Sequence, residues 1–126
     1  MGNTIFWLYM FICLLLIPLV MIIFGTIFRR AAPKKINPLF GYRSEQSMKD
    51  KESWDFAHKQ VGSIWRRWGF AMLISIVPMF FVYGKDVDTV SYWGLAIIVL
   101  QLIVMIIPIF IVEKRLKNFN KNRKEE

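Results

Sequence analysis

The sequence predicts an all-α membrane protein with three transmembrane helices and an amphipathic interfacial helix between the first two. Hydrophobic residues make up 56% of the 126 residues, and the mean hydropathy is +0.41, above that of a soluble globular chain. Three apolar runs are long enough to cross a bilayer. The 17 Lys and Arg residues crowd beside the ends of these runs, which is typical of membrane topology and not of a nucleic-acid groove.

A chain of this length forms one domain, residues 1–126, and its elements follow from the apolar runs. A helix needs about 20 apolar residues to cross the hydrocarbon layer. We expect transmembrane helices at about residues 5–28, 65–83 and 90–112, a cytosolic loop with the amphipathic helix at 29–66, and a basic tail at 113–126.

The segment between the first two spans combines a loop with a helix. Asn37-Pro38 and Gly41 interrupt any helix there, because a residue before proline avoids the helical region and glycine permits a tight turn. Ser47 and Asp50 have the spacing of a capping box, which predicts that the next helix starts at Ser47.

This next helix is amphipathic. Apolar residues from Trp54 to Trp68 recur at steps of three and four, which predicts one apolar face. Arg66 and Arg67 must remain at the level of the lipid headgroups. We therefore expect the helix to bend at Gly62 or Gly69 before the second span.

The distribution of charge predicts the orientation. Residues 29–69 carry ten Lys or Arg, the turn at residues 84–89 carries one, and the tail carries six. The positive-inside rule then places the N-terminus outside, with the central segment and the C-terminus in the cytoplasm. We expect the basic cluster at residues 29–35 to contact the anionic inner leaflet of the lipid bilayer, and the tail to fray beyond its first turns.

One amide side chain, that of Gln101, lies near the centre of the third span. An amide in hydrocarbon needs a partner, and the candidates are Ser75 or a backbone carbonyl freed by a proline. Prolines occur in all three spans, at Pro18, Pro78 and Pro108. A contact between helices is one interpretation of Gln101, and a contact with a substrate or an ion is the other.

The sequence offers no constellation for catalysis or metal binding. It contains one histidine, His58, and one cysteine, Cys13, and the two ligands that Asp55 and His58 could supply from one helix do not make a metal site. Asp55 and His58, three residues apart, fit a surface pair better. We expect no enzyme, no catalytic residue, no metal and no cofactor, and a membrane hydrolase that uses His58 is the alternative.

The loop and the start of the central helix instead predict a binding surface. An arginine beside a tyrosine after a glycine turn could hold a phosphate headgroup or a carboxylate of a partner. An internal brace explains the same residues equally well. In that interpretation Arg43 pairs with Asp55 or Glu52, and Trp54 fills the space beneath the loop. The candidate binding or bracing residues are Asn37, Gly41, Tyr42, Arg43, Ser44, Glu45, Ser47, Trp54 and His58.

Three short motifs in this region resemble a known signature. Residues 37–44 read NPLFGYRS, residues 47–49 read SMK and residues 54–57 read WDFA. They are similar to the signature of the SdpI membrane-protein family, N-x-x-x-G-Y-R-T, S-M and W-x-x-A-N. Ser44 stands where threonine is common and keeps the hydroxyl, whereas His58 stands where asparagine is common.

The resemblance implies a multi-pass protein of the bacterial cytoplasmic membrane that is not an enzyme. The best understood member of that family gives immunity against a secreted toxic peptide and holds a repressor at the membrane. We therefore expect a role in immunity or toxin resistance, with a peptide toxin or a cytosolic protein as partner. The alternative is a small transporter or lipid-handling subunit, which would work as a homo-oligomer because three helices enclose little space.

Overall fold

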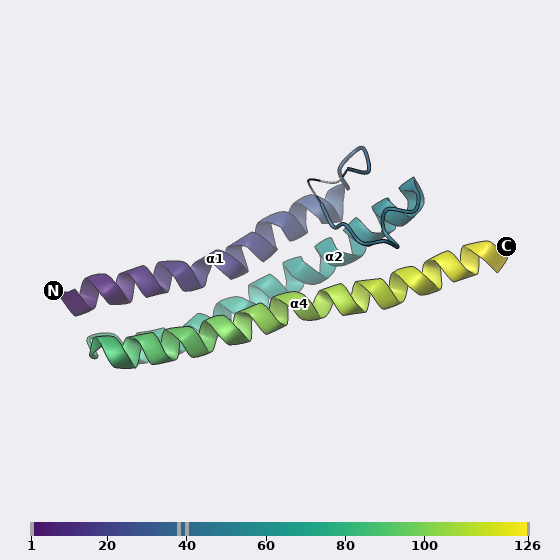
Figure 1. Ribbon diagram of the computed structural model, residues 1–126. Helices are drawn as coiled ribbons and strands as arrows, with labels where there is room; N and C mark the ends of the chain where they lie inside the picture. The colour runs from purple at the N-terminus through teal and green to yellow at the C-terminus, as the bar shows by residue number, and fades with distance from the viewer. Residues whose placement is uncertain (1, 38, 40, 126) are drawn as a thin grey trace.

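The computed structural model describes residues 2–37, 39 and 41–125. Three long helices lie side by side, and the longest connection joins the first helix to the second (Figure 1). This arrangement confirms the predicted all-α class, with three helices long and apolar enough to cross a membrane. The elements are α1 (Gly2–Arg30), α2 (Lys51–Met72), the 3₁₀ helix η1 (Leu73–Ile76), α3 (Pro78–Phe81) and α4 (Val87–Glu125).

The outward faces of the helices are apolar. Ile5, Phe81, Tyr92 and Phe110 are between 69% and 78% exposed. Exposing so large an apolar surface to water would be unfavourable, whereas apolar lipid chains solvate it without this cost. The exposed surface therefore fits the membrane class as well as the length of the helices does.

The start of α2 differs from the prediction. The helix begins at Lys51 and its N-cap is Asp50, whose Oδ1 accepts from the Ser53 amide at 2.8 Å. The prediction of a helix starting at Ser47 is therefore wrong. Aspartate is at least as good an N-cap as serine and adds a negative charge at the positive end of the helix, so Asp50 defines the boundary.

The predicted bend in the central helix is also wrong. α2 continues without a break through Gly62 and Gly69, so the amphipathic segment and the second span belong to one helix. These glycines face α1. A Cβ on Gly62 would lie 2.8 Å from the Gly25 carbonyl oxygen, and a Cβ on Gly25 would lie 2.5 Å from the Arg66 amide nitrogen. The two backbones thus touch, which is the usual role of glycine between membrane helices.

The second span changes geometry near Pro78, after the end of α2. Proline has no amide hydrogen to donate to the Ile74 carbonyl, and the chain tightens into η1 just before it. The amide of Val77 bonds to that carbonyl at 3.1 Å. After α3, Gly84 adopts a φ of +81° in the tight turn that leads to α4.

α4 extends farther than expected. The prediction that the tail frays beyond its first turns is wrong, since the helix reaches Glu125. Val112 and Leu116 are fully buried, and they belong to a cluster with Ala57 and Val61 of α2. Packing against α2 thus continues the helix well beyond the apolar run.

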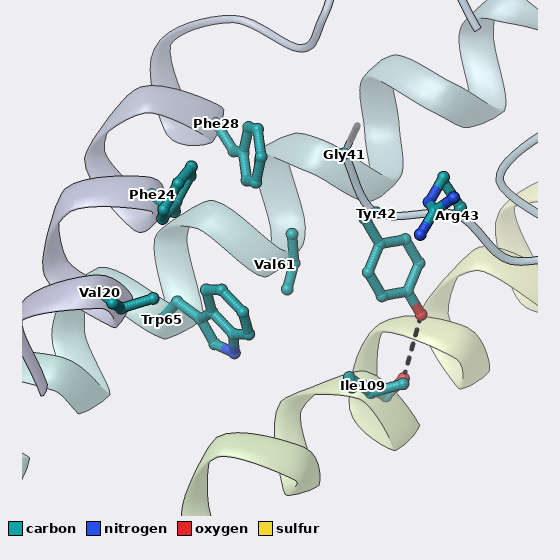
Figure 2. A pocket seen from close by; sticks show the side chains of 9 residues that line it. All are labelled: Val20, Phe24, Phe28, Gly41, Tyr42, Arg43, Val61, Trp65 and Ile109. Carbon is teal, nitrogen blue, oxygen red and sulfur yellow. Dashed lines mark hydrogen bonds between the residues drawn. The ribbon is translucent and has the colours of Figure 1, made fainter. Parts of the chain in front are cut away.

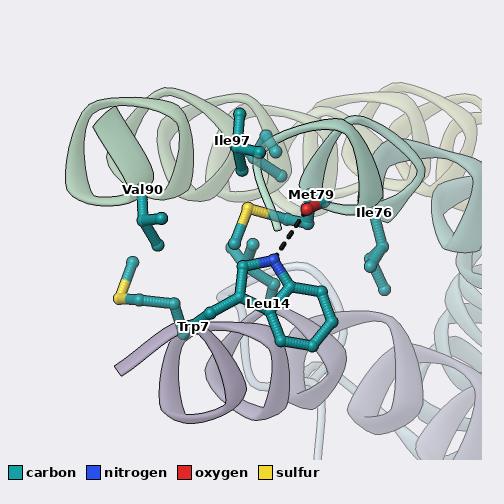
Figure 3. Close-up of a cluster of buried hydrophobic side chains, with 8 residues drawn as sticks. Trp7, Leu14, Ile76, Met79, Val90 and Ile97 are labelled. Carbon is teal, nitrogen blue, oxygen red and sulfur yellow. Dashed lines mark hydrogen bonds between the residues drawn. The ribbon is translucent and has the colours of Figure 1, made fainter. Parts of the chain in front are cut away.

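A second hydrophobic cluster holds the opposite ends of the helices together. The Trp7 indole nitrogen donates to the Met79 carbonyl oxygen at 2.7 Å (Figure 3). Its ring lies edge-on to Tyr83, with centroids 4.9 Å apart. The buried residues of this cluster are Trp7, Met10, Leu14, Ile76, Met79, Val82, Val90 and Ile97.

Gln101 of α4 joins that helix to α1 and to η1. Its side-chain nitrogen donates to the Leu14 carbonyl oxygen at 3.0 Å and to the Ser75 hydroxyl oxygen at 3.1 Å. Pro18 lacks the amide hydrogen that would otherwise reach the Leu14 carbonyl. Both partners predicted from the sequence are therefore confirmed, and the side chain is fully buried.

The close crossing of α1 and α2 yields a stability prediction. We expect Gly62→Ala to lower the free energy of unfolding by about 1–3 kcal/mol, because the new methyl group would meet α1 backbone that cannot move aside like a side chain. Thermal unfolding in detergent would measure the loss. Ser63→Ala, on the next residue, is the control and should leave stability unchanged; equal stability of the two variants would contradict a backbone contact at Gly62.

Candidate functional site

The loop between α1 and α2 is shaped by a turn at Asn37 and a glycine. The Asn37 side chain accepts from the Leu39 amide at 3.0 Å and donates to the Lys35 carbonyl at 3.0 Å. Gly41 has a φ of +111°, and a Cβ there would lie 2.7 Å from the His58 Nε2 atom. Both backbone conformation and space therefore require glycine, as the sequence predicted.

His58 lies at the centre of the site and is fully buried. Its Nε2 accepts from the Tyr42 amide at 2.8 Å, so the ring proton sits on Nδ1, which donates to the Trp54 carbonyl at 2.7 Å. Only the neutral ring makes both bonds. The ring also lies edge-on to Phe28, with centroids 4.9 Å apart, and 4.3 Å from the Trp54 ring.

The burial of His58 corrects the expectation of an exposed Asp55–His58 pair. Asp55 lies on the half-exposed side of α2 and forms an ion pair with Lys51, at 2.9 Å. His58 faces the loop and the end of α1 instead. Among the described residues, no group of three or more His, Cys, Asp or Glu side chains could hold a metal ion.

Two serines form the inner frame of the loop. The Ser44 amide donates to the Ser47 hydroxyl at 2.8 Å, and the Ser47 amide donates to the Ser44 hydroxyl at 3.1 Å. The Ser47 hydroxyl lies 3.1 Å from the Tyr42 carbonyl oxygen and is fully buried. Ser47 therefore stabilises the loop and does not cap α2.

Trp54 and Arg43 differ in their exposure to solvent. The Trp54 indole is fully buried beneath the loop and donates to the Pro33 carbonyl at 2.8 Å, which confirms that Trp54 fills this space. Arg43 is exposed, and so is Glu45. The ion pairs that the structure shows for Asp55 and Glu52 are with Lys51 and Arg123.

Tyr42 connects the loop to α4. Its hydroxyl donates to the Glu113 carboxylate at 2.6 Å and lies 3.3 Å from the Ile109 carbonyl oxygen. Burial raises the pKa of the Tyr42 phenol above its usual value, and the bond to the Glu113 carboxylate raises it further. The phenol therefore remains a proton donor at any physiological pH.

A pocket of about 470 Å³ opens beside Tyr42 (Figure 2). It lies at the end of the bundle where α1 and α4 diverge toward the loop (Figure 1). Its walls are apolar and come from all three long helices, whereas Tyr42 and Arg43 of the loop form a polar rim. Figure 2 shows the Tyr42 ring between this space and α4. The lining residues are Val20, Phe24, Phe28, Gly41, Tyr42, Arg43, Val61, Trp65 and Ile109.

The end of α4 is clamped to the start of α2 by Arg123. Its guanidinium donates to Asp50 and Glu52, each at 2.7 Å, and to Asn120 at 2.7 Å. The Ser53 hydroxyl donates to the same Asn120 oxygen at 2.7 Å. None of these tail residues was predicted as part of the site. The signal was the spacing of Glu113, Leu116, Asn120 and Arg123 at three and four residues, which continues one helix face beyond the apolar run.

These features define an integral membrane protein of the multi-pass, all-α class, with a polar loop folded over one end of the bundle. Comparison with protein families is more specific. Residues 34–112 match the model of the SdpI/YfhL protein family, so the chain belongs to this family. The match begins in the loop after α1 and includes His58, α2 and the apolar part of α4.

The chain is also similar to a protein of Bacillus subtilis (strain 168) described as "Uncharacterized protein YfhL". The two are 32% identical over 104 residues, which cover 77% of this chain and 79% of the relative. No solved structure matches. The resemblance stated from the motifs is thus confirmed at the level of the family.

The hydrogen bonds of His58 predict how substitutions there behave. We expect His58→Phe to lower the free energy of unfolding by about 1–3 kcal/mol, because the Tyr42 amide loses its acceptor. His58→Asn, which restores an acceptor and a donor, should recover part of this loss. Chemical denaturation in detergent would compare them, with the exposed Lys59→Asn as control; a fully stable His58→Phe variant would show that the bond contributes nothing.

Asp50 predicts a loss of stability in acid. Its bonds from Arg123 and from the Ser53 amide lower its pKa to about 2 from 3.8. The unfolded state therefore binds the proton first, and this contribution to stability is present above about pH 4 and lost as the pH falls toward 2. Because Asp50 is largely exposed, the effect should be small.

Thermal midpoints measured at pH 5 and pH 2.5 would test this. Asp50→Asn should be less stable than the wild type at pH 5 and should lose less on acidification. Glu45→Gln, an exposed change in the same loop, should follow the wild type. A wild-type protein and an Asp50→Asn variant with the same pH dependence would contradict the prediction.

Proposed function

We propose that this SdpI-family protein confers immunity or resistance to a secreted peptide toxin, and that it acts by binding and not by catalysis. The observation that carries the proposal is the pocket beneath the loop. Its rim is formed by Gly41, Tyr42 and Arg43, which are the residues of the family-like motif, and its walls are apolar. A toxin that inserts into the membrane presents an apolar segment, which such a pocket fits.

The position of the pocket supports entry from the bilayer. Val20 and Ile109, from α1 and α4, lie at its sides, and both are around 40% exposed on the outer face of the bundle. A peptide segment already in the membrane could therefore reach the pocket sideways without crossing the loop. Binding there would withdraw the peptide from the lipid phase in which it is toxic.

Arg43 supplies the polar part of this recognition in our proposal. Its guanidinium lies at the rim, where it could bind a carboxylate of the peptide with two parallel hydrogen bonds. Trp54, His58 and Ser47 hold the loop from beneath, whereas Arg43 is exposed at the rim of the pocket. This separation of roles makes Arg43 a suitable position for a functional test.

The proposal includes the location. We place the chain in the bacterial cytoplasmic membrane on the basis of its family, and the positive-inside rule orients it with its N-terminus outside and its C-terminus in the cytoplasm. The exposed outer surface of the loop, with Glu45, would then be open to a cytosolic protein partner. The transporter alternative was motivated by Gln101, whose side-chain nitrogen is engaged in contacts among the helices, and we do not propose it.

Survival of a toxin-sensitive bacterium that expresses each variant at equal membrane abundance would test the function. Expression of the wild type should protect the cells against the cognate peptide, and Arg43→Ala should reduce protection strongly without loss of the folded protein. Lys49→Ala, which removes the same charge from the same loop, should protect like the wild type.

A second pair of variants tests the pocket itself. Val20→Trp would fill the pocket from its edge, whereas Leu16→Trp places the same indole side chain one turn away on an exposed position of α1. Protection should be lost with the first and retained with the second. Equal protection by all four variants, or none by the wild type, would refute the proposal.

A further inference from the structure

Arginines from two helices meet on the face of the bundle where α1 crosses α2. Arg29 and Arg30 end α1, and Arg66 and Arg67 lie in α2. Two surface pockets of about 370 Å³ and 270 Å³ share Arg29 and Arg66. Thr26 and Arg30 complete the first, and Ser63 and Arg67 complete the second.

The glycine contact is what brings these arginines together. Gly25 precedes Arg29 by four residues, and Gly62 precedes Arg66 by four residues. In the antiparallel crossing, each glycine lies against the backbone of the other helix's arginine. The backbones are therefore in contact at the level of Arg29 and Arg66. The long side chains of these two arginines extend from the crossing, so that one ligand could contact both.

Protein groups do not neutralise this charge. The Nε of Arg67 donates to the Ser63 carbonyl at 3.3 Å, and the Arg66 guanidinium lies 5.6 Å from the Phe70 ring centroid. Within the described residues, the ion pairs involve Lys51 and Arg123 but none of these four arginines. By contrast, two carboxylates face Arg123 at the far end of the same helix. Four cations next to an apolar surface repel one another unless an anion lies between them.

We propose that this arginine cluster binds a phosphate group, supplied by the headgroup of an anionic membrane lipid. Guanidinium groups match phosphate oxygens with pairs of hydrogen bonds, and several of them can hold one doubly charged group. Ile23, Ile27 and Phe70 are exposed beside the cluster and would lie along the acyl chains. The site is separate from the pocket beneath the loop and does not depend on the proposed immunity function.

Native mass spectrometry of the purified protein, titrated with phosphatidic acid or phosphatidylcholine, tests this inference. Phosphatidic acid should bind the wild type as a discrete adduct, and Arg29→Gln/Arg66→Gln should weaken it at least about ten-fold. The control Lys34→Gln/Lys35→Gln removes the same charge from the neighbouring loop and should weaken it less than about two-fold. Equal losses in the two double variants would show diffuse attraction only and would overturn the inference.

Two further measurements identify the chemistry. Arg29→Lys/Arg66→Lys keeps charge and fold but removes the guanidinium forks, so it should also bind more weakly; wild-type affinity there would contradict the site. Inorganic phosphate alone, added without lipid, distinguishes the source of the phosphate. Arginine-dependent stabilisation by it would support the site with a soluble ligand, and lipid binding without it would assign the headgroup. Binding of neither probe would overturn the proposal.

Discussion

The contact between the backbones of α1 and α2 at Gly25 and Gly62 determines most of what surrounds it. It fixes the end of α1 over α2, so that Phe28 packs against the His58 ring. The ring in turn accepts from the amide of Tyr42, and that residue carries the loop across to α4. A larger residue at the crossing would therefore disturb a series of contacts that ends on the third helix.

Inside the bundle, side-chain donors bond to backbone carbonyl groups of other helices. Water is absent from the hydrocarbon layer, so each polar group needs a partner within the protein. The Gln101 side-chain amide donates to the Leu14 carbonyl, and the Trp7 indole donates to the Met79 carbonyl in α3. The first bond supplies a donor to the carbonyl that Pro18 leaves free, and both bonds join segments that are distant in sequence.

The sequence was informative where one physical constraint acts alone. Hydropathy defined three spans, the need for a partner identified the contacts of Gln101, and the glycine turn at Gly41 was expected from its neighbours. It misled where two local signals compete. Ser47 and Asp50 are both good N-caps, and only the folded loop, which buries the serine, decides between them.

Other features depend on residues too far away to be read locally. A glycine inside a helix suggests a bend until a second backbone lies against it, as α1 does at Gly62. His58 has a polar sequence neighbourhood, and its burial follows from Phe28 and Gly41. The clamp at Arg123 joins residues about seventy positions apart in the sequence. The periodicity of α4 indicates which of its faces is buried, but it does not identify the residues at the start of α2 that Arg123 contacts.

The arrangement around His58 also implies an order of assembly during synthesis. The contacts that the described residues make with His58 come from α1, the loop and α2, which emerge before α4. α1 and α2 can therefore pack against each other, at Gly25 and Gly62 and around the His58 ring, while α4 is still being synthesised. Until α4 is in place, Val112 and Leu116 do not cover Ala57 and Val61. The exposed apolar face of α2 around Ala57 and Val61 is therefore the surface that a chaperone or insertase would contact.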